Sequence, residues 1–172
     1  RWAHETWEAK VSEARVTGRD IEPVEYRITC KDGGVRTMLI SGITTESDYL
    51  ATFFDVTERC QAETELRKLA QAVEQSPESI VITNLDAEIE YVNAAFLHTT
   101  GYALEEVIGR NPHMLNSGHT PQATYDTLWR ALKRGDTWKG EFNNRRKDGS
   151  EYTEFAIITP LRKPDGSISH YV

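Results

Sequence analysis

The sequence predicts an α+β fold in which helices gather on one face of an antiparallel sheet. Over residues 76–172, two short strand patterns come first, three helical patterns follow, and three strand patterns end the segment. A shorter run of strand patterns near the N-terminus repeats the last part of this order. A helical stretch without Gly or Pro separates the two regions.

An internal repeat defines the domain organisation. Residues 24–37 match residues 140–153 at a constant offset, and each copy carries the turn signal Lys-Asp-Gly. A repeat of this size indicates two copies of one domain type, so we expect residues 1–55 to be the C-terminal part of a first domain. The second domain is then residues 76–172. For the first copy, we expect a helix ending at Gly18, followed by strands over about 22–31, 35–44 and 49–55.

Residues 56–75 form the predicted linker helix. Ala62, Leu66, Leu69 and Val73 recur at heptad spacing, which is typical of a coiled-coil seam. We therefore expect a homodimer through this helix. An amphipathic helix lying on its own domain explains the same spacing equally well.

The second domain begins with a predicted hairpin and short helices. Asn93 is a suitable N-cap for the helix that follows the hairpin, and Gly109 stops another short helix. Thr120 is the expected N-cap of the long helix, with Pro121 in its first position. The expected elements, in chain order, are strands 80–83 and 89–92, a helix from residue 94, helix 104–108, loop 111–118, helix 122–134, and strands 140–146, 151–159 and 167–172.

The long helix and the strand after it carry the residues of greatest interest. Tyr125, Leu128, Trp129 and Leu132 share one face of helix 122–134 by their helical spacing. Alternation along strand 140–146 places Phe142 and Asn144 together on the concealed face of the sheet. A buried amide such as Asn144 needs partners for both its carbonyl and its NH₂ group. Either the fold or a ligand must supply them.

Composition excludes several classes of function. The net charge is −7 and the pI is near 5.3, which argues against nucleic acid as a partner. The two cysteines, Cys30 and Cys60, show no metal-ligand spacing, and a reducing cytoplasm is the expected compartment. No apolar run is long enough to span a membrane, so we expect no direct membrane contact by this segment. The chain does not begin with Met, and we expect it to derive from a longer protein.

Catalytic and metal-binding patterns are not evident. No Ser-His-Asp set, carboxylate pair or phosphate-binding Gly loop stands out, so we expect no catalysis in this segment. His98, His113 and His119 are scattered, and the long helix of this domain contains no His. We therefore expect neither heme nor a metal ion.

Four short motifs identify a family resemblance. They are N-x-A-F at 93–96, T-G-Y at 100–102, E-E-V-I-G at 105–109 and D-V-T-E-R at 55–59. Together with the order of elements, they resemble PAS sensor domains. The resemblance implies a five-stranded PAS sheet with helices on one face over residues 76–172. Because a second D-V-T-E-R is absent, we expect this domain to lack the end of its last strand.

A longer pattern is similar to one branch of PAS domains. N-S-G-H-T-P, L-W and W-x-G-E-F-x-N-R-R-K-D-G resemble the branch that contains the nitrogen-fixation regulator, the bacterial aerotaxis receptor and the methane-monooxygenase sensor. The resemblance implies FAD between the helices and the inner sheet face. Pro112 stands where the nitrogen-fixation sensor has Glu, and the same pattern occurs in PAS domains without an established ligand. The expected cofactor-binding residues are Trp129, Asn144, Phe142, Leu128 and Trp138.

The resemblance suggests two functions. The first is a cytosolic input module of a bacterial signal-transduction protein that senses redox or oxygen through FAD. The alternative is a ligand-free PAS module for dimerisation and signal relay. In either case, the expected output domain lies outside this chain, in a histidine kinase of a two-component system or in a cyclic-dinucleotide enzyme such as a diguanylate cyclase.

Two comparisons, one with photoactive flavin–thiol PAS domains and one with the first copy of the repeat, limit where we expect a flavin and which chemistry we expect from it. Pro112 follows Asn111 where photoactive flavin–thiol PAS domains need Cys, and residues 76–172 contain no Cys. We therefore expect no blue-light adduct chemistry. In the first copy, Ile28 stands at the position of Asn144, and Ser12 or Glu13 at that of Trp129, so we expect no flavin there.

Overall fold

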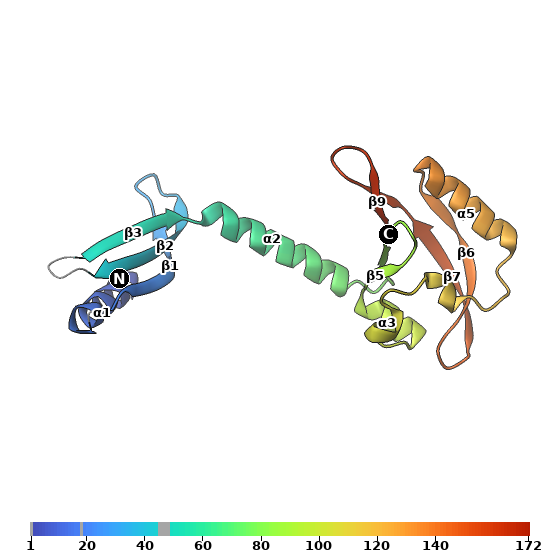
Figure 1. Cartoon of the computed structure of the whole chain (residues 1–172), viewed down its shortest axis with the longest axis horizontal. Helices are drawn as coiled ribbons and strands as arrows, with labels where there is room; N and C mark the ends of the chain where they lie inside the picture. The colour runs from blue at the N-terminus through green and yellow to red at the C-terminus, as the bar shows by residue number, and fades with distance from the viewer. Residues whose placement is uncertain (1, 18, 45–48) are drawn as a thin grey trace. The chain divides into compact units, whose positions relative to one another are not determined.

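The structure is a computed structural model, and it describes residues 2–17, 19–44 and 49–172 (Figure 1). Within the described residues the chain forms two compact units, Arg1–Lys68 and Leu69–Val172, which meet within one helix. The expected helix end at Gly18 lies outside the described residues.

The first unit is a helix followed by a three-stranded antiparallel sheet in the order β1-β2-β3. Ala14, Ile21, Tyr26 and Ile40 are buried and form its core. The strands expected from the repeat are confirmed to within two residues. The elements are α1 (Trp2–Thr17), β1 (Ile21–Thr29), β2 (Val35–Thr44) and β3 (Tyr49–Asp55).

Helix α2 (Thr57–Glu74) covers all but the first and last residues of the segment predicted to be a helix between the two copies. It begins where Asp55 Oδ1 accepts a hydrogen bond from the Thr57 N–H, while Thr57 Oγ1 accepts one from the Thr37 N–H. No side chain of α2 is buried, and the seam residues Leu66 and Leu69 are 68% and 59% exposed. None of the described helices is both long and apolar enough to cross a membrane.

The second unit has the predicted order of strands and helices, with two additions: a 3₁₀ helix within the expected loop 111–118 and a short strand at Pro160–Arg162. The Asn93 cap is confirmed, because its Oδ1 accepts a hydrogen bond from the Phe96 N–H at the start of α3. Gly101 ends that helix in the left-handed conformation, with φ of 75°. The elements are β4 (Val81–Thr83), β5 (Ile89–Val92), α3 (Ala94–Thr100), α4 (Leu104–Val107), the 3₁₀ helix η1 (Pro112–Leu115), α5 (Gln122–Arg134), β6 (Trp138–Arg145), β7 (Glu151–Ile158), β8 (Pro160–Arg162) and β9 (Ile168–Tyr171).

The strands of the second unit form a four-stranded sheet, β5-β4-β9-β8, and the β6–β7 hairpin. One continuous segment, 151–162, joins them by changing partner at Thr159. Residues up to Ile158 pair with β6, and those from Pro160 pair with β9. Thr159 itself exchanges two backbone hydrogen bonds with Val172. The strand predicted over 151–159 corresponds to β7, whereas β8, which follows the change of partner, was not predicted.

Helix α5 lies against the β6–β7 hairpin (Figure 1). Its buried residues Leu128, Ala131 and Leu132 form one apolar cluster with Trp138 of β6. A second cluster gathers around α3 and β5. The core of this unit is thus divided into two clusters, and the second consists of Ile89, Val92, Phe96, Val107 and Leu115.

The expected cap of α5 is wrong. Pro121 occupies the N-cap position and makes no side-chain cap bond. The Thr120 hydroxyl instead accepts a hydrogen bond from the Asn143 N–H at 2.9 Å and donates one to the Asn143 carbonyl at 3.3 Å. The reason is that β6 is an edge strand, whose unpaired backbone groups need partners that the loop before α5 supplies.

Candidate functional site

The inner face of the β6–β7 hairpin is the candidate site. Alternation along both strands turns Phe142 and Asn144 of β6, and Tyr152 and Glu154 of β7, toward the apolar core. In the strand register Phe142 lies opposite Glu154, and Asn144 lies opposite Tyr152. Three polar side chains thus gather on a face that is otherwise apolar.

Asn144 is the most buried of these polar residues, with 7% of its surface exposed. Its Nδ2 donates a hydrogen bond to Oε2 of Glu154 at 2.9 Å. Among the hydrogen bonds of the described residues, none ends on Oδ1 of Asn144. The fold therefore supplies a partner for the NH₂ group and leaves the carbonyl oxygen available.

Glu154 and Tyr152 are both perturbed by burial. Burial raises the pKa of the Glu154 carboxyl, and the hydrogen bond from Asn144 opposes part of that rise. Burial also raises the pKa of Tyr152, the Glu154 charge adds to the rise, and Asn144 and Arg146 oppose it. The Tyr152 hydroxyl oxygen is buried without a hydrogen-bond partner. A buried polar atom without a partner is costly, and it points to a ligand or water in the functional state.

The inner-face side chains are less covered than their position suggests. Phe142, Tyr152, Glu154 and Ala156 face the core, yet each is only half-buried. A single domain usually has one contiguous apolar core, whereas this unit has two clusters. The protein's own side chains thus cover the inner face incompletely.

The structure brings Leu128, Trp138 and Phe142 together in one cluster. The Trp138 and Phe142 ring centroids are 5.1 Å apart, and Trp138 Nε1 donates a hydrogen bond to Oγ1 of Thr127. The indole lies over Gly140, where an added Cβ would collide with ring atoms Cζ2 and Cη2 of Trp138. This contact explains why Gly lies between the two aromatic residues of the W-x-G-E-F motif.

Trp129 lies outside that cluster. Its side chain is 37% exposed, and its ring makes an edge contact with Tyr171 of β9 at a centroid distance of 6.3 Å. Consecutive helix residues point about 100° apart, so a helix that buries Leu128 turns Trp129 toward its margin. The prediction that both residues share the apolar face of α5 is wrong for Trp129.

Sequence analysis did not single out Tyr125, His113 or Glu154 as site residues. The Tyr125 ring lies 5.7 Å from Phe142, and the His113 ring lies 5.4 Å from Tyr125. Glu154 could have been found from alternation along β7, which places it on the same face as Ala156. No sequence signal indicated that His113 approaches α5.

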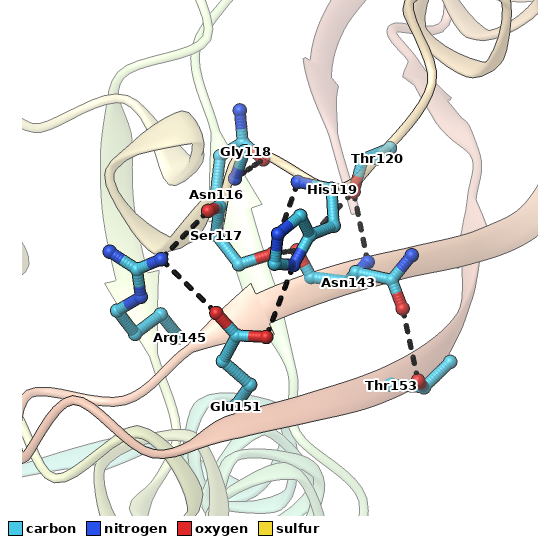
Figure 2. A network of polar contacts seen from close by, with 9 residues as sticks. All are labelled: Asn116, Ser117, Gly118, His119, Thr120, Asn143, Arg145, Glu151 and Thr153. Atoms are coloured by element: carbon cyan, nitrogen blue, oxygen red, sulfur yellow. Dashed lines mark hydrogen bonds and ion pairs between the residues drawn. The ribbon is translucent and has the colours of Figure 1, made fainter.

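The loop before α5 covers the open edge of β6 (Figure 2). Ser117 donates to the Asn143 carbonyl from both its N–H and its hydroxyl, at 3.2 and 2.7 Å. Asn116 forms a β-bridge with Asn144. The N-S-G-H-T motif therefore holds the backbone of Asn143 and, through the Asn116 bridge, that of Asn144, whose side chain lies on the inner face.

An ionic cluster on the outer face fastens the same loop. Glu151 contacts Arg145 at 3.1 Å through one carboxylate oxygen and His119 at 3.1 Å through the other, as Figure 2 shows. Arg145 also donates to the Ser117 carbonyl at 2.8 Å. The Arg145 hydrogen bond and the His119 charge lower the pKa of Glu151. These groups are exposed, so the cluster stabilises the loop only modestly.

Asn93 ties the end of α2 to the second unit. It is fully buried, its Oδ1 accepts from the Ile80 and Phe96 N–H groups, and its Nδ2 donates to three carbonyls that include Val73 of α2. Nearby, Tyr91 donates to a Glu74 carboxylate oxygen at 2.6 Å, which raises the pKa of Tyr91 to about 12. Asn93 of the N-x-A-F motif thus caps α3 and also forms a hydrogen bond with the last turn of α2.

The described residues contain no group of three or more His, Cys, Asp or Glu side chains able to hold a metal ion. Any ligand of the inner face therefore has to be recognised by the amide, carboxyl, hydroxyl and aromatic groups described above.

Comparison with known proteins identifies the second unit. A family model described as PAS domain matches residues 77–172, which is more than half of the chain. The chain belongs to the PAS domain family. It is 38% identical over 100 residues to a nitrogen fixation regulatory protein of Klebsiella oxytoca, covering 58% of this chain and 20% of that protein. It is 34% identical over 90 residues to the aerotaxis receptor of Escherichia coli (strain K12), covering 52% and 18%.

A solved structure of a PAS relative confirms the α+β fold. The structure titled "Flavin Analogue Sheds Light on Light-Oxygen-Voltage Domain Mechanism" superposes with a TM-score of 0.56 at 32% identity, covering 60% of this chain and 79% of that one. The second unit is a PAS sensory domain related to a nitrogen fixation regulatory protein, an aerotaxis receptor and a light-oxygen-voltage domain. The chain spans about a fifth of the length of these two curated relatives.

Proposed function

We propose that the second unit binds FAD on the inner face of the β6–β7 hairpin and reports redox state or oxygen to a bacterial signalling protein. The observation that carries this proposal is the polar set Asn144, Glu154 and Tyr152 on a face whose side chains are not all fully buried. The nitrogen fixation and aerotaxis relatives support the same choice.

The residues on this face fit a flavin. The polar edge of an isoalloxazine ring presents carbonyl acceptors and an N–H donor, and an amide matches these with paired hydrogen bonds. Asn144 has an available Oδ1, since its hydrogen bond to Glu154 engages Nδ2. The unpartnered Tyr152 hydroxyl adds a further donor. Phe142, Leu128 and Trp138 offer an apolar surface beside these groups.

A bound flavin would supply reversible electron acceptance, which none of these side chains provides. Asn144 would hold the polar edge, and Phe142 would shield the ring from water. Because the Asn144 backbone bridges to Asn116, a change in the hydrogen bonding of its amide can alter the loop before α5. A change at the flavin would thus reach the loop before α5 through the backbone of β6.

Titration of the purified chain with FAD tests the proposal. We expect a yellow complex with a flavin absorption spectrum, and FAD identified by mass after heat release. Asn144→Leu should weaken FAD binding by about 1–3 kcal/mol, since one hydrogen-bonding partner of the ring is lost. Asn143→Leu is the matched control, because this neighbouring amide faces Thr153 on the outer side. A folded chain that stays colourless after reconstitution contradicts the proposal.

We propose, second, that α2 mediates dimerisation and relays a signal. A PAS module that binds no ligand would have this same function. The exposure of Leu66 and Leu69 supports a parallel homodimer through this helix. Such a dimer would pass a signal to an output domain, such as a histidine kinase or a cyclic-dinucleotide enzyme. The repeat and the α-β-β-β order of the first unit support its assignment as the corresponding part of another PAS domain.

Sedimentation tests the dimer. Leu66→Glu with Leu69→Glu places charges in the seam and should yield a monomer, because buried unpaired charge is strongly unfavourable. Gln61→Glu with Gln71→Glu adds the same charge at exposed positions outside the seam and should remain dimeric. A wild-type chain that is monomeric at high micromolar concentration contradicts this proposal.

A further inference from the structure

We propose that Glu154 is a positioning residue whose protonation decides which atom of the Asn144 amide is presented to the bound flavin. The ligand in this inference rests on the proposed function. The coupling between the two side chains is a property of the chain itself and can be measured without flavin.

The location of Glu154 is the first argument. It lies on the inner face of β7, directly opposite Phe142, and on the same side as the apolar Ala156 and Ile158. A hairpin needs no carboxyl group in this position. A carboxylate with apolar neighbours is disfavoured unless a cation or several donors stabilise it.

The partners of Glu154 are the second argument. None of the ion pairs formed by the described residues includes it. Its hydrogen bond comes from Nδ2 of Asn144 at 2.9 Å. Burial raises the pKa of Glu154. Proton uptake by Glu154 in the folded chain is therefore easier than by an exposed glutamate.

The other titratable or charged groups around this pair are few. Tyr152 lies on the same strand, and the Arg146 guanidinium lies 4.4 Å from the Tyr152 ring centroid. From α5, Tyr125 contacts Phe142, and from η1, His113 contacts Tyr125. Arg146 is engaged by the Thr99 carbonyl and the Ser150 hydroxyl. None of these groups forms a described ion pair with Glu154.

The chemistry of the two side chains gives the mechanism. An ionised carboxylate only accepts hydrogen bonds, so it holds the NH₂ group of Asn144 and leaves Oδ1 for the ligand. A protonated carboxyl also donates, and it can donate to Oδ1 of Asn144 after the amide rotates. The NH₂ group then faces the ligand. When Glu154 is ionised, Asn144 thus favours a flavin N–H that donates to Oδ1. When Glu154 is protonated, Asn144 favours a flavin carbonyl that accepts from its NH₂ group.

The test begins with the full 172-residue chain without flavin. Nuclear magnetic resonance follows the side-chain NH₂ signal of Asn144 and the carboxyl carbon of Glu154 as the pH rises from acid to neutral. The variants Asn144→Leu and Glu154→Gln assign the two signals. We expect one shared midpoint above the ordinary glutamate range. An Asn144 signal that does not titrate in the folded wild-type chain overturns the inference, and this result needs no variant to fold.

The second arm uses FAD. We expect FAD affinity of the wild type to change several-fold through the same midpoint, and that of Glu154→Gln to be independent of pH there. Glu141→Gln, on the exposed outer face of β6, is the matched control and should behave as wild type. A Glu154→Gln variant with an unchanged pH dependence overturns the inference. If the chain takes up no FAD, the proposed function fails, and the flavin-free titration alone decides whether Glu154 controls Asn144.

Discussion

The hairpins β1–β2 and β6–β7 have the same strand register but different inner faces. In the first hairpin Tyr26 pairs with Met38, and at the corresponding place in the second Phe142 pairs with Glu154. Tyr26 is 4% exposed, whereas Phe142 is only half-buried. The same topology therefore accommodates a fully covered aromatic ring in one unit and a partly covered one in the other.

The next pair along the strands sharpens the contrast. Ile28 lies opposite Arg36 in the first hairpin, and Asn144 lies opposite Tyr152 in the second. Ile28 is 38% exposed, while Asn144 is 7% exposed. A hairpin of this register thus forms without any of the three inner polar residues. The register therefore does not require them, which supports the proposal that they bind a ligand.

The largest effect should come from giving the second hairpin the residues of the first. Asn144→Ile with Glu154→Met should reduce FAD affinity by about 10- to 100-fold, because hydrogen bonds to the ring are lost. Folding should be retained, since the same residues occupy this register at Ile28 and Met38. Equilibrium titration with FAD, together with thermal unfolding of the flavin-free chain, measures both outcomes.

The effect of Glu154 on the pH dependence of stability has a defined sign. The folded-state pKa of Glu154 is raised, so its contribution to stability is fully present below the unfolded pKa and is lost as pH rises through the folded value. Removing the carboxyl should therefore flatten the pH dependence in that window. Unchanged FAD affinity in the double variant would show that Asn144 and Glu154 are not needed for FAD binding by the second hairpin.

An intermediate effect is expected at Gly140, where the first copy has Val24. Gly140→Val should lower the free energy of unfolding by about 1–3 kcal/mol, because its side chain collides with the buried Trp138 ring. Chemical denaturation measures the loss.

A double-mutant cycle provides the control for Gly140. Trp138→Leu removes the ring, so Gly140→Val should cost less in that background than in the wild type. Equal costs in both backgrounds would mean that Trp138 is not what restricts position 140.

The smallest effect should come from the outer ionic cluster, which the first hairpin lacks because Thr29 and Val35 occupy the positions of Arg145 and Glu151. The folded-state pKa of Glu151 is lowered, so its stabilisation is present above the unfolded pKa and is lost as pH falls through the folded value. Glu151→Gln should make thermal stability slightly less dependent on pH in the acid range.

Salt provides the control for this cluster. High ionic strength should reduce the difference between wild type and Glu151→Gln, because both partners of Glu151 are exposed. A difference that is insensitive to salt would indicate that Glu151 acts through the loop hydrogen bonds instead.

Much of the fold was predictable because its signals are local. The Asp148-Gly149 turn and the Asn93 cap depend on neighbouring residues, and each appears where predicted. The apolar spacing of α5 predicted the burial of Leu128 and Leu132 but not the exposed position of Trp129. The face of Asn144 also followed from strand alternation. The cap at Thr120 failed because a distant strand edge competes for its hydroxyl.

The sequence by itself determined the repeat, the order of elements other than η1 and β8, the helix between the repeats and the concealed position of Asn144. Only the tertiary structure decided that Glu154 is the partner of Asn144, that Trp129 lies at the margin of α5, and that the loop before α5 covers β6. The physical reason is that these contacts depend on strand register and helix rotation, which side chains far apart in the sequence fix together.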